Sequence, residues 1–431
     1  MLDRLRTAVD AGFKRQTAFY ADLVRFPSIR GHEAPCQDWI AGELRARGYS
    51  VDRYILADVD MDHLPGFSPV MDTDYAAAVQ VVATRRAANP TGRSLILQGH
   101  VDVVPPGPLA LWSTPPFSPV VRDGWLHGRG AGDMKQGVAA IVFALDALAA
   151  AGLEPAADVI LQTVTEEECT GNGALSTLAR GYRADAVLIT EPTDGTITRA
   201  HVGVIWFRLK VRGVPVHVAR AQSGTNAIMS AYALIQALMI YTEALNRAAA
   251  ADPWFGTIPD PIKFNPGVIR GGDWASSTPA WCEVDCRIGL MPGASLEKAR
   301  QGVLDTVAAA ARTDGFLANN PPEVEWNGFQ ADGYVLDPGS DTERTLAAAH
   351  QAVFGEPMQE RRSTAVNDTR FYGLYHRIPA LCYGPRGENH HGFDERGHLD
   401  TLRQTTLAVA LFIADWCGTR AVSPSPGEGP E

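Results

Sequence analysis

The sequence predicts an α/β fold with a mainly parallel sheet, into which a smaller α+β domain is inserted. In the first half of the chain, apolar strand-like runs alternate with helical patterns, as in a parallel sheet covered by helices. Near residue 205 the order changes to strand, helix, two strands and helix, and the first pattern returns after residue 315. The length of 431 residues exceeds what one hydrophobic core usually serves, so two domains are expected.

The elements of the larger domain follow from the spacing of apolar residues. Helices are predicted where apolar residues recur at helical spacing, and strands where short apolar runs are bounded by turn residues. Residues 58–75 are polar and rich in proline and glycine, so they are predicted to form a loop insertion. The predicted helices are residues 5–26, 34–48, 138–151, 342–353 and 402–416, and the predicted strands are residues 49–55, 79–83, 94–98, 158–165, 186–190 and 380–383.

The predicted domain boundaries follow the change of pattern. Residues 1–203 and 317–418 form the two parts of the larger domain, and residues 204–316 form the inserted domain. Residues 419–431 are small and rich in proline and glycine, so we predict a disordered tail. Within the inserted domain, the predicted strands are residues 206–211, 264–269 and 281–288, and the predicted helices are residues 228–245 and 296–311.

Composition excludes some classes of function. The chain has 45% apolar and 20% charged residues and a net charge of −11, which argues against nucleic acid or an anionic membrane as partner. Charged residues interrupt residues 1–30, and the apolar run 138–151 is too short to span a bilayer. The six cysteines include no C-x-x-C pair, which is typical of reduced thiols. We therefore expect a cytoplasmic protein.

The run Leu95–Val104 is an apolar strand that ends on a histidine and an aspartate. Side chains alternate faces along a strand, so His100 and Asp102 are expected to leave the sheet on the same side. The carboxyl end of a strand is also where open α/β sheets build their sites. We therefore expect the functional site at this edge of the sheet.

Further ligand types stand after other predicted turns and strands. The glycine-dense run 125–137 presents Asp133, and its G-x-G-x-G-D order lacks the nucleotide-binding patterns, so a cation ligand is the better interpretation. The strands 158–165 and 186–190 are both followed by acidic residues. Carboxylates gathered at one sheet edge repel one another unless cations or protons intervene, although the glutamate run taken alone could be a solvated acidic face. Cys169 follows three glutamates that raise a thiol pKa, which favours a packing role.

Five motifs together resemble the co-catalytic zinc family of acetylornithine deacetylase, succinyl-diaminopimelate desuccinylase, aminoacylase and glutamate carboxypeptidase. Any one motif is weak evidence, but the five occur in order over nearly the whole chain. The motifs are G-H-V-D-V-V (99–104), G-R-G-A-G-D-M-K (128–135), E-E-E-C-T-G-N-G-A (166–174), E-P-T (191–193) and H-G-F-D-E (391–395). The resemblance implies a zinc exopeptidase-like fold, with a mixed, mainly parallel sheet, helices on both faces and an inserted lid and dimerisation domain.

The resemblance also implies two divalent metal ions, most simply zinc, with cobalt or manganese as alternatives. Asp133 would bridge the two ions. His100 and Glu191 would complete the ligands of one ion, and Glu168 and His391 those of the other. The H-x-x-D-E spacing selects His391 over its neighbour His390.

Two further residues of these motifs would act beside the metal ions. By the same resemblance, Asp102 would fix the tautomer of His100, and Glu167 would be the general base. A pair of ions lowers the pKa of a bridging water and polarises the scissile carbonyl, so a nearby carboxylate can take the proton and deliver it to the leaving amine.

Motifs of the inserted segment resemble the family's lid. On that analogy His217 would reach the partner subunit's site in a homodimer and help hold the oxyanion, with Asn226 as its support. Arg287 would grip a substrate carboxylate, and Arg370 would contact either substrate or protein. Where relatives carry an asparagine after Gly-Gly, this chain has the shorter Ser276, so the substrate group bound there is expected to differ.

These observations give one main hypothesis and two alternatives. The main one is a dimeric metal-dependent hydrolase that cleaves the amide of a small N-acylated amino acid or amine, near the loosely named deacylases such as formylaminopyrimidine deformylase. The second is an exopeptidase acting on dipeptides or a terminal glutamate, which the sequence does not separate from the first. The third is an inactive relative kept as a binding module, which predicts lost ligands, whereas all of them are present.

Overall fold

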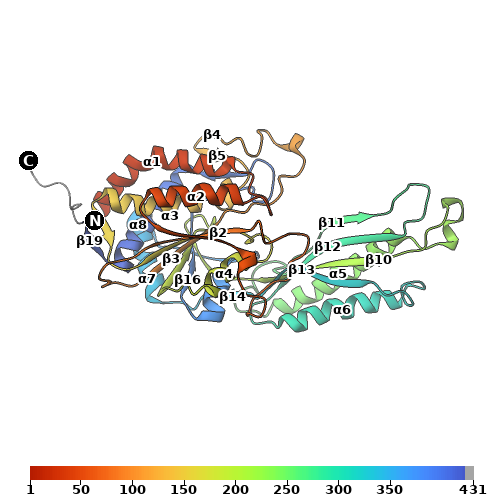
Figure 1. The fold of residues 1–431 in the computed structure, drawn as a ribbon. Coiled ribbons are helices and arrows are strands. Elements are labelled where there is room, and N and C mark those ends of the chain that lie inside the picture. Colours follow the sequence, from red (N-terminus) through yellow and green to blue (C-terminus); the bar gives the residue numbers. More distant parts are fainter. Residues whose placement is uncertain (423–431) are drawn as a thin grey trace, which may run out of the picture.

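The computed structural model describes residues 1–422 and confirms the predicted fold class (Figure 1). The larger domain is built on a six-stranded sheet of order β1-β2-β7-β3-β8-β16, in which β7, β3, β8 and β16 are parallel and β2 runs antiparallel to its neighbours β1 and β7. The strands are β1 (Ser50–Ile55), β2 (Val79–Arg85), β3 (Leu95–His100), β7 (Val159–Val164), β8 (Ala186–Ile189) and β16 (Ala380–Cys382). The predicted strands 79–83 and 94–98 are therefore not neighbours, because β7 lies between them.

Helices cover both faces of this sheet because side chains along each strand alternate between two cores. Leu95 and Leu97 of β3 belong to the core beneath α1, α2, α3 and α8, whereas Ile96 belongs to the core beneath α4. Figure 1 shows α1, α2 and α3 on one side of the sheet and α4 on the other. The helices of this domain are α1 (Leu2–Arg25), α2 (Ala34–Ala46), α3 (Gln136–Ala150), α4 (Asn172–Ala179), α7 (Asp341–Phe354) and α8 (Leu399–Cys417).

The inserted domain is an antiparallel sheet of order β11-β12-β10-β13 with two helices along one face (Figure 1). Phe207 and Leu209 of β10 pack with Leu238 of α5 and Val303 of α6 in a separate core. The elements are β10 (Gly203–Arg212), α5 (Ala227–Ala249), β11 (Phe264–Gly271), β12 (Trp281–Leu290), α6 (Leu296–Arg312) and β13 (Glu323–Ala331).

The insertion ends later than the predicted boundary at residue 316. Strand β13 pairs with β10, so residues 323–331 belong to the smaller sheet rather than to the larger domain. Its outer half reads Glu-Val-Glu-Trp, and Glu325 forms an ion pair with Lys210 of β10. A strand of this kind, with charges pointing away from the core, lacks the apolar run by which a strand is usually recognised.

Within residues 1–422, short strands outside the two main sheets form three smaller sheets. Thr419–Ala421 form β19, which pairs with β6 (Leu153–Pro155), so this part of the predicted tail is ordered, and residues 423–431 lie outside the described residues. Strand β9 (Ile197–His201) lies between β14 (Tyr334–Val335) and β15 (Glu360–Ser363), next to the strands that enter and leave the insertion. The other short strands are β4 (Val120–Arg122), β5 (Trp125–His127), β17 (Gly387–Glu388) and β18 (Arg396–His398).

Helix α5 differs from the other helices in its exposed apolar surface. By length and composition alone it could cross a membrane. Of its most apolar window, 33% is buried inside the protein. Its buried side, including Leu234 and Leu238, packs against the inserted sheet. Its other side exposes Met229, Tyr232, Met239 and Ile240.

Candidate dinuclear metal site

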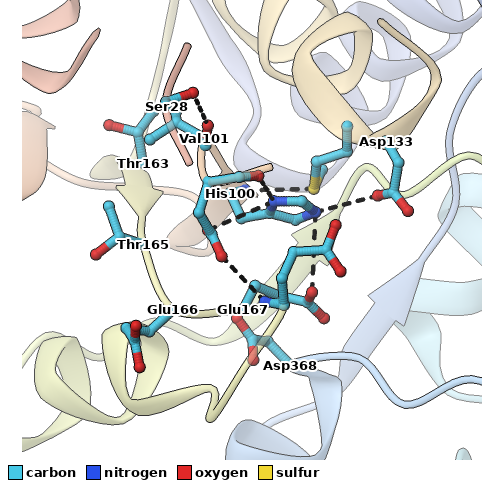
Figure 2. Close-up of polar contacts among 12 residues, drawn as sticks. Ser28, His100, Val101, Asp133, Thr163, Thr165, Glu166, Glu167 and Asp368 are labelled. Atoms are coloured by element: carbon cyan, nitrogen blue, oxygen red, sulfur yellow. Dashed lines mark hydrogen bonds and ion pairs between the residues drawn. The ribbon is translucent and has the colours of Figure 1, made fainter. Parts of the chain in front are cut away.

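The site begins at the carboxyl end of β3, where His100 is almost fully buried. Its Nδ1 lies 2.9 Å from the backbone carbonyl oxygen of Asp102, and its Nε2 lies 3.1 Å from Oδ1 of Asp133 (Figure 2). A carbonyl oxygen can only accept a hydrogen bond, so Nδ1 carries the proton and Nε2 presents its lone pair towards Asp133. This tautomer is the one that a metal ligand needs.

Asp102 contacts His100 through both its backbone and its side chain. Its carboxylate Oδ1 lies 3.6 Å from Nδ1 of His100, beyond the distance of the carbonyl contact, while Oδ2 accepts a hydrogen bond of 3.0 Å from the backbone N–H of Glu168. The shorter contact to the histidine therefore comes from the backbone of Asp102, while its carboxylate lies beside the ring, where it acts against burial to raise the pKa of His100, and also positions the turn that carries Glu168. Sequence spacing could not separate these two roles, because both belong to one residue.

Asp133 projects from the glycine-dense turn between β5 and α3. Gly130 has φ of +77°, and a Cβ there would lie 2.5 Å from a methyl carbon of Val103, so the turn requires glycine. Glu395 holds this turn from the opposite side. One of its oxygens accepts from the N–H of Asp133 at 2.8 Å, and the other accepts from the N–H of Gly130 at 2.9 Å and from Arg129 at 2.6 Å.

Two groups of ligand atoms share Asp133. The first is His100, Asp133 and Glu191, the second is Asp133, Glu168 and His391, and within each group the ligand atoms lie within 4.8 Å of one another. Oδ1 of Asp133 faces His100, whereas Oδ2 lies 3.6 Å from Nε2 of His391, which is itself 3.1 Å from Oε2 of Glu168. Each oxygen of one carboxylate therefore faces a different group, as a bridging ligand requires.

The charges of these groups fit bound cations. Burial raises the pKa of Glu167 and of Glu191 well above the usual range, and neighbouring carboxylates add to the effect. Oε1 of Glu191 is buried without a hydrogen-bond partner among the described residues. Burial also acts to raise the pKa of Asp133, but its hydrogen bonds to His100 and His391 outweigh it and lower that pKa well below its usual range. Imidazole nitrogens with carboxylates suit zinc, cobalt or manganese.

Glu167 belongs to neither group of ligand atoms. Its Oε2 lies 3.9 Å from Nε2 of His100, its side chain is buried, and it lines the cavity beside the site (Figure 2). A carboxylate held at this distance from the ligands, with a high pKa, can exchange a proton with a molecule bound between them.

A cavity of about 270 Å³ opens beside these residues, between the two domains. The larger domain supplies the candidate ligands, and the inserted domain supplies Arg287 and an apolar wall. The lining residues are Asp133, Glu167, Glu168, Glu191, Pro192, Thr193, Thr198, Val204, Trp206, Arg287, Phe329, Arg361, Ser363, Ala365, Val366, Asn367, Cys382, His390 and His391.

Three predicted site residues lie elsewhere. His217 and Asn226 belong to the segment that joins β10 to α5, and Asn226 caps α5 by accepting from the N–H groups of Ile228 and Met229. Neither lines the cavity of its own chain. Arg370 does not line it either. Its fully buried guanidinium donates to the carbonyl oxygens of Asn367 and Thr170, so we correct its role to a structural one.

Sequence reasoning also missed residues that the structure places at the site. Glu395 ends a motif that was recognised, so its position was visible but its contact with Asp133 was not. Trp206, Phe329 and Arg361 gave no signal, because they come from three strands whose neighbours in space are far apart in the sequence.

Cys169 has the packing environment expected of it. Burial raises the pKa of its thiol well above the usual range, and the charge of Glu166 adds to this effect.

Comparison with known proteins finds a matching family, two similar enzymes and a solved structure with a similar fold. The model of peptidase family M20/M25/M40 matches residues 96–415. An N-formyl-4-amino-5-aminomethyl-2-methylpyrimidine deformylase of Halalkalibacterium halodurans is 30% identical over 97% of this chain and 98% of its own length. A succinyl-diaminopimelate desuccinylase of Rhodopseudomonas palustris is 31% identical over 89% of this chain and 94% of its own length. Among solved structures, the dipeptidase Dug1p of Saccharomyces cerevisiae has a similar fold, with a TM-score of 0.78 at 15% identity, covering 97% of this chain and 98% of its own.

The contacts of Glu395 predict a role in metal affinity. In Glu395→Gln an amide NH₂ replaces one acceptor oxygen and faces the donors of the Asp133 turn, so zinc affinity is expected to fall by about 10- to 100-fold. Competition with a chromophoric chelator measures this. Glu388→Gln is the matched control, because Glu388 lies on the neighbouring strand but pairs with Arg386 and Arg396 outside the ligand groups. Unchanged affinity in Glu395→Gln would contradict the role.

A buried carboxyl behind the site predicts a pH effect. Both oxygens of Glu33 lack a partner among the described residues, and burial, followed by the charge of Asp102, raises its pKa from 4.5 to about 8. The unfolded chain releases this proton at lower pH than the folded protein, so the native state loses stability as pH rises from about 4.5 to about 8. Glu33→Gln cannot ionise and should be more stable than the wild type by roughly 2–4 kcal/mol at pH 8, with the difference vanishing near pH 4.5. Thermal unfolding across this range tests the prediction, which fails if the difference is the same at every pH.

Proposed function

This chain belongs to peptidase family M20/M25/M40, and on that premise we propose that it is a dinuclear zinc deacylase acting on small N-acylated amino acids or amines. Two of its relatives are named as a deformylase and a desuccinylase, and removal of a formyl or succinyl group from an amine is hydrolysis of an amide. The observation that carries the proposal is the pair of ligand groups sharing Asp133 beside a cavity lined by Glu167. Cobalt or manganese would suit the same ligands.

The residues present would divide the reaction between them. Bound divalent ions would make water acidic enough to attack at neutral pH and would polarise the scissile carbonyl. Glu167 accepts the proton of the attacking water and returns it to the nitrogen of the leaving amine. Its position supports this role, because its buried side chain lines the cavity beside the ligand groups. The carbonyl of Asp102 accepts from Nδ1 of His100, which leaves Nε2 facing Asp133 as the ligand atom.

We further propose a homodimer formed through the inserted domain. Strand β11 is an edge strand on which Val268 and Ile269 are exposed, and α5 next to it exposes Met229, Tyr232 and Ile240. Edge strands and apolar patches of this kind are typical of association surfaces. A dimer would also give His217 a site to act on, because it lies outside the cavity of its own chain. The cytoplasmic location stays a prediction.

The proposed base predicts a sharp difference between neighbouring glutamates. Glu167→Gln is expected to lower kcat by at least about 10²–10⁴-fold, because the proton acceptor is lost, while two metal ions remain bound. Glu168→Gln, its matched control, should lose metal because it removes a ligand. Turnover and metal content by mass spectrometry separate the two outcomes, and full activity in Glu167→Gln would exclude it as the base.

The same assay distinguishes the candidate activities. A panel of N-formyl, N-acetyl, N-succinyl and dipeptide substrates is expected to show the fastest turnover on an N-acyl compound, with loss of turnover in the presence of a chelator. Fastest turnover on dipeptides would favour the exopeptidase. A wild type that binds two metal ions but hydrolyses nothing in the panel would favour an inactive binding relative.

The proposed dimer predicts a mass of about twice 46.4 kDa by light scattering. Ile240→Glu combined with Ile269→Glu places charges in the apolar surface and should give monomers. Leu304→Glu on α6 is the matched control, since Leu304 is also exposed but lies on the other helix of the domain. If His217 acts across the dimer, the monomeric variant loses turnover while keeping its metal ions. A wild type that stays monomeric at micromolar concentration would contradict the dimer.

A further inference from the structure

The cavity carries positive charge that its candidate metal ligands do not balance. Four carboxylates line it, Asp133, Glu167, Glu168 and Glu191, and two divalent cations would neutralise their formal charge of −4. Two guanidinium groups, Arg287 and Arg361, remain. Once metal is bound, the lining therefore has a net positive charge of two, apart from its histidines. An anionic ligand would be attracted to such a cavity.

Arg287 comes from the inserted domain and forms no ion pair with a carboxylate among residues 1–422. Its strand neighbour Asp285 is already engaged by Arg208 at 2.6 Å and by Arg270 at 3.3 Å. Burial lowers the pKa of Arg287. The cross-strand partner of Arg287 is Trp206, which also lines the cavity.

Arg361 comes from the other wall, on β15. Glu360, the preceding residue, points to the opposite face, where it pairs with Arg199 at 2.7 Å. The pairing of β15 with β9 has a register shift between Arg361 and Arg362, an irregularity that typically re-aims side chains beside active sites. Arg361 donates to the carbonyl oxygen of Pro192 at 3.2 Å, and it too lacks a carboxylate within ion-pair distance in the described part of the chain.

An apolar surface accompanies these charges. Trp206 and Phe329 meet edge to face with ring centroids 5.4 Å apart, and Val204 and Val366 pack with them. This wall is suited to an apolar or planar part of a ligand whose charged ends lie elsewhere.

We propose that Arg361 is a specificity-determining residue that binds a second anionic group of the substrate. With one guanidinium on each wall, the cavity selects amides that carry two anionic groups, one for Arg287 and one for Arg361, joined by a part that packs against Trp206. A substrate of this kind would also link the two domains through its own charges. The inference rests on the proposed amide hydrolysis, whose substrate class it narrows.

Matched substrates test the proposal and show which side of the amide carries the second charge. N-acetylmethionine has one anionic group, N-succinylmethionine adds one on the acyl side, and N-acetylglutamate adds one on the amine side. The wild type is expected to have a higher kcat/KM for one of the two dianionic substrates than for N-acetylmethionine. Faster hydrolysis of N-acetylmethionine than of both would overturn the proposal.

Substitution of Arg361 separates recognition from a structural role. Arg361→Gln should lower kcat/KM for the preferred dianionic substrate by about 10- to 100-fold, mainly through KM, because a charged hydrogen bond is lost. It should leave N-acetylmethionine within about 3-fold of wild type. Arg361→Lys should show an intermediate loss of kcat/KM, because lysine keeps the charge but lacks the paired N–H donors of the guanidinium. The matched control is Arg362→Gln, because Arg362 is exposed and does not line the cavity. An equal loss on all three substrates would show that Arg361 only positions the Pro192 turn, and would overturn the proposal.

A binding measurement keeps this test independent of turnover. Thermal unfolding of the zinc-loaded protein is measured with glutarate and with butyrate, which differ by one carboxylate. Glutarate is expected to raise the Tm more than butyrate in the wild type, and this difference should disappear in Arg361→Gln. If no amide in the panel is hydrolysed but this pattern holds, the proposed function fails and the anion site stands. If amides are hydrolysed and the pattern is absent, the anion site fails alone.

Discussion

The constraint on which this structure depends is one carboxylate shared by two groups of ligands. Asp133 directs one oxygen to His100 and the other to His391, so three separate segments must meet with ångström accuracy. The sheet fixes His100, because β3 is buried between β7 and β8. Glu395 fixes the turn of Asp133. Lys135, two residues further on, donates to the carbonyl oxygens of Leu23 and Phe26 and so ties the same turn to the end of α1.

The inserted domain contributes residues to the cavity through the register of its strands, not through a recognisable sequence motif. Its strand β10 begins beside β9 and runs away from the larger domain, so only the first residues of β10 and the last residues of β12 and β13 can reach the cavity. Trp206, Arg287 and Phe329 lie in that zone. His217 follows the opposite end of β10, where it bridges to Ser277 ahead of β12, and it does not line the cavity of its own chain. A single antiparallel sheet thus supplies one wall of the cavity at one end and leads into the segment of His217 at the other.

The sequence could predict the site residues that lie next to the end of a strand. His100, Glu168 and Glu191 stand at the ends of apolar strands, so pattern alone placed them at one edge of the sheet, whereas their roles as ligands came from the resemblance to the zinc family. What it could not predict depends on long-range packing. Arg370 stands in a recognisable segment, but its side chain turns inward against Phe371 and leaves the cavity to Asn367. Strand β13 was missed because its charged outer half does not resemble a core strand. The role of Asp102 depends on which of its oxygens faces His100, a choice that residue identity does not contain.

The three consecutive glutamates show how backbone geometry gives identical side chains three different positions and roles. Glu166 has φ of +69°, and its carboxylate is turned away from the cavity to bind Arg30 at 2.5 and 2.8 Å and the hydroxyl of Tyr75 at 2.9 Å. Because that turn is fixed, Glu167 enters the cavity and Glu168 faces His391. Replacing the first glutamate would remove no ligand and no proton acceptor, but it would remove the ion pair that anchors this turn to Arg30. The separation of Glu167 and Glu168 matters because adjacent carboxylates in one orientation would compete for the same cation. With the turn in place, one is left to bind metal and the other to move a proton.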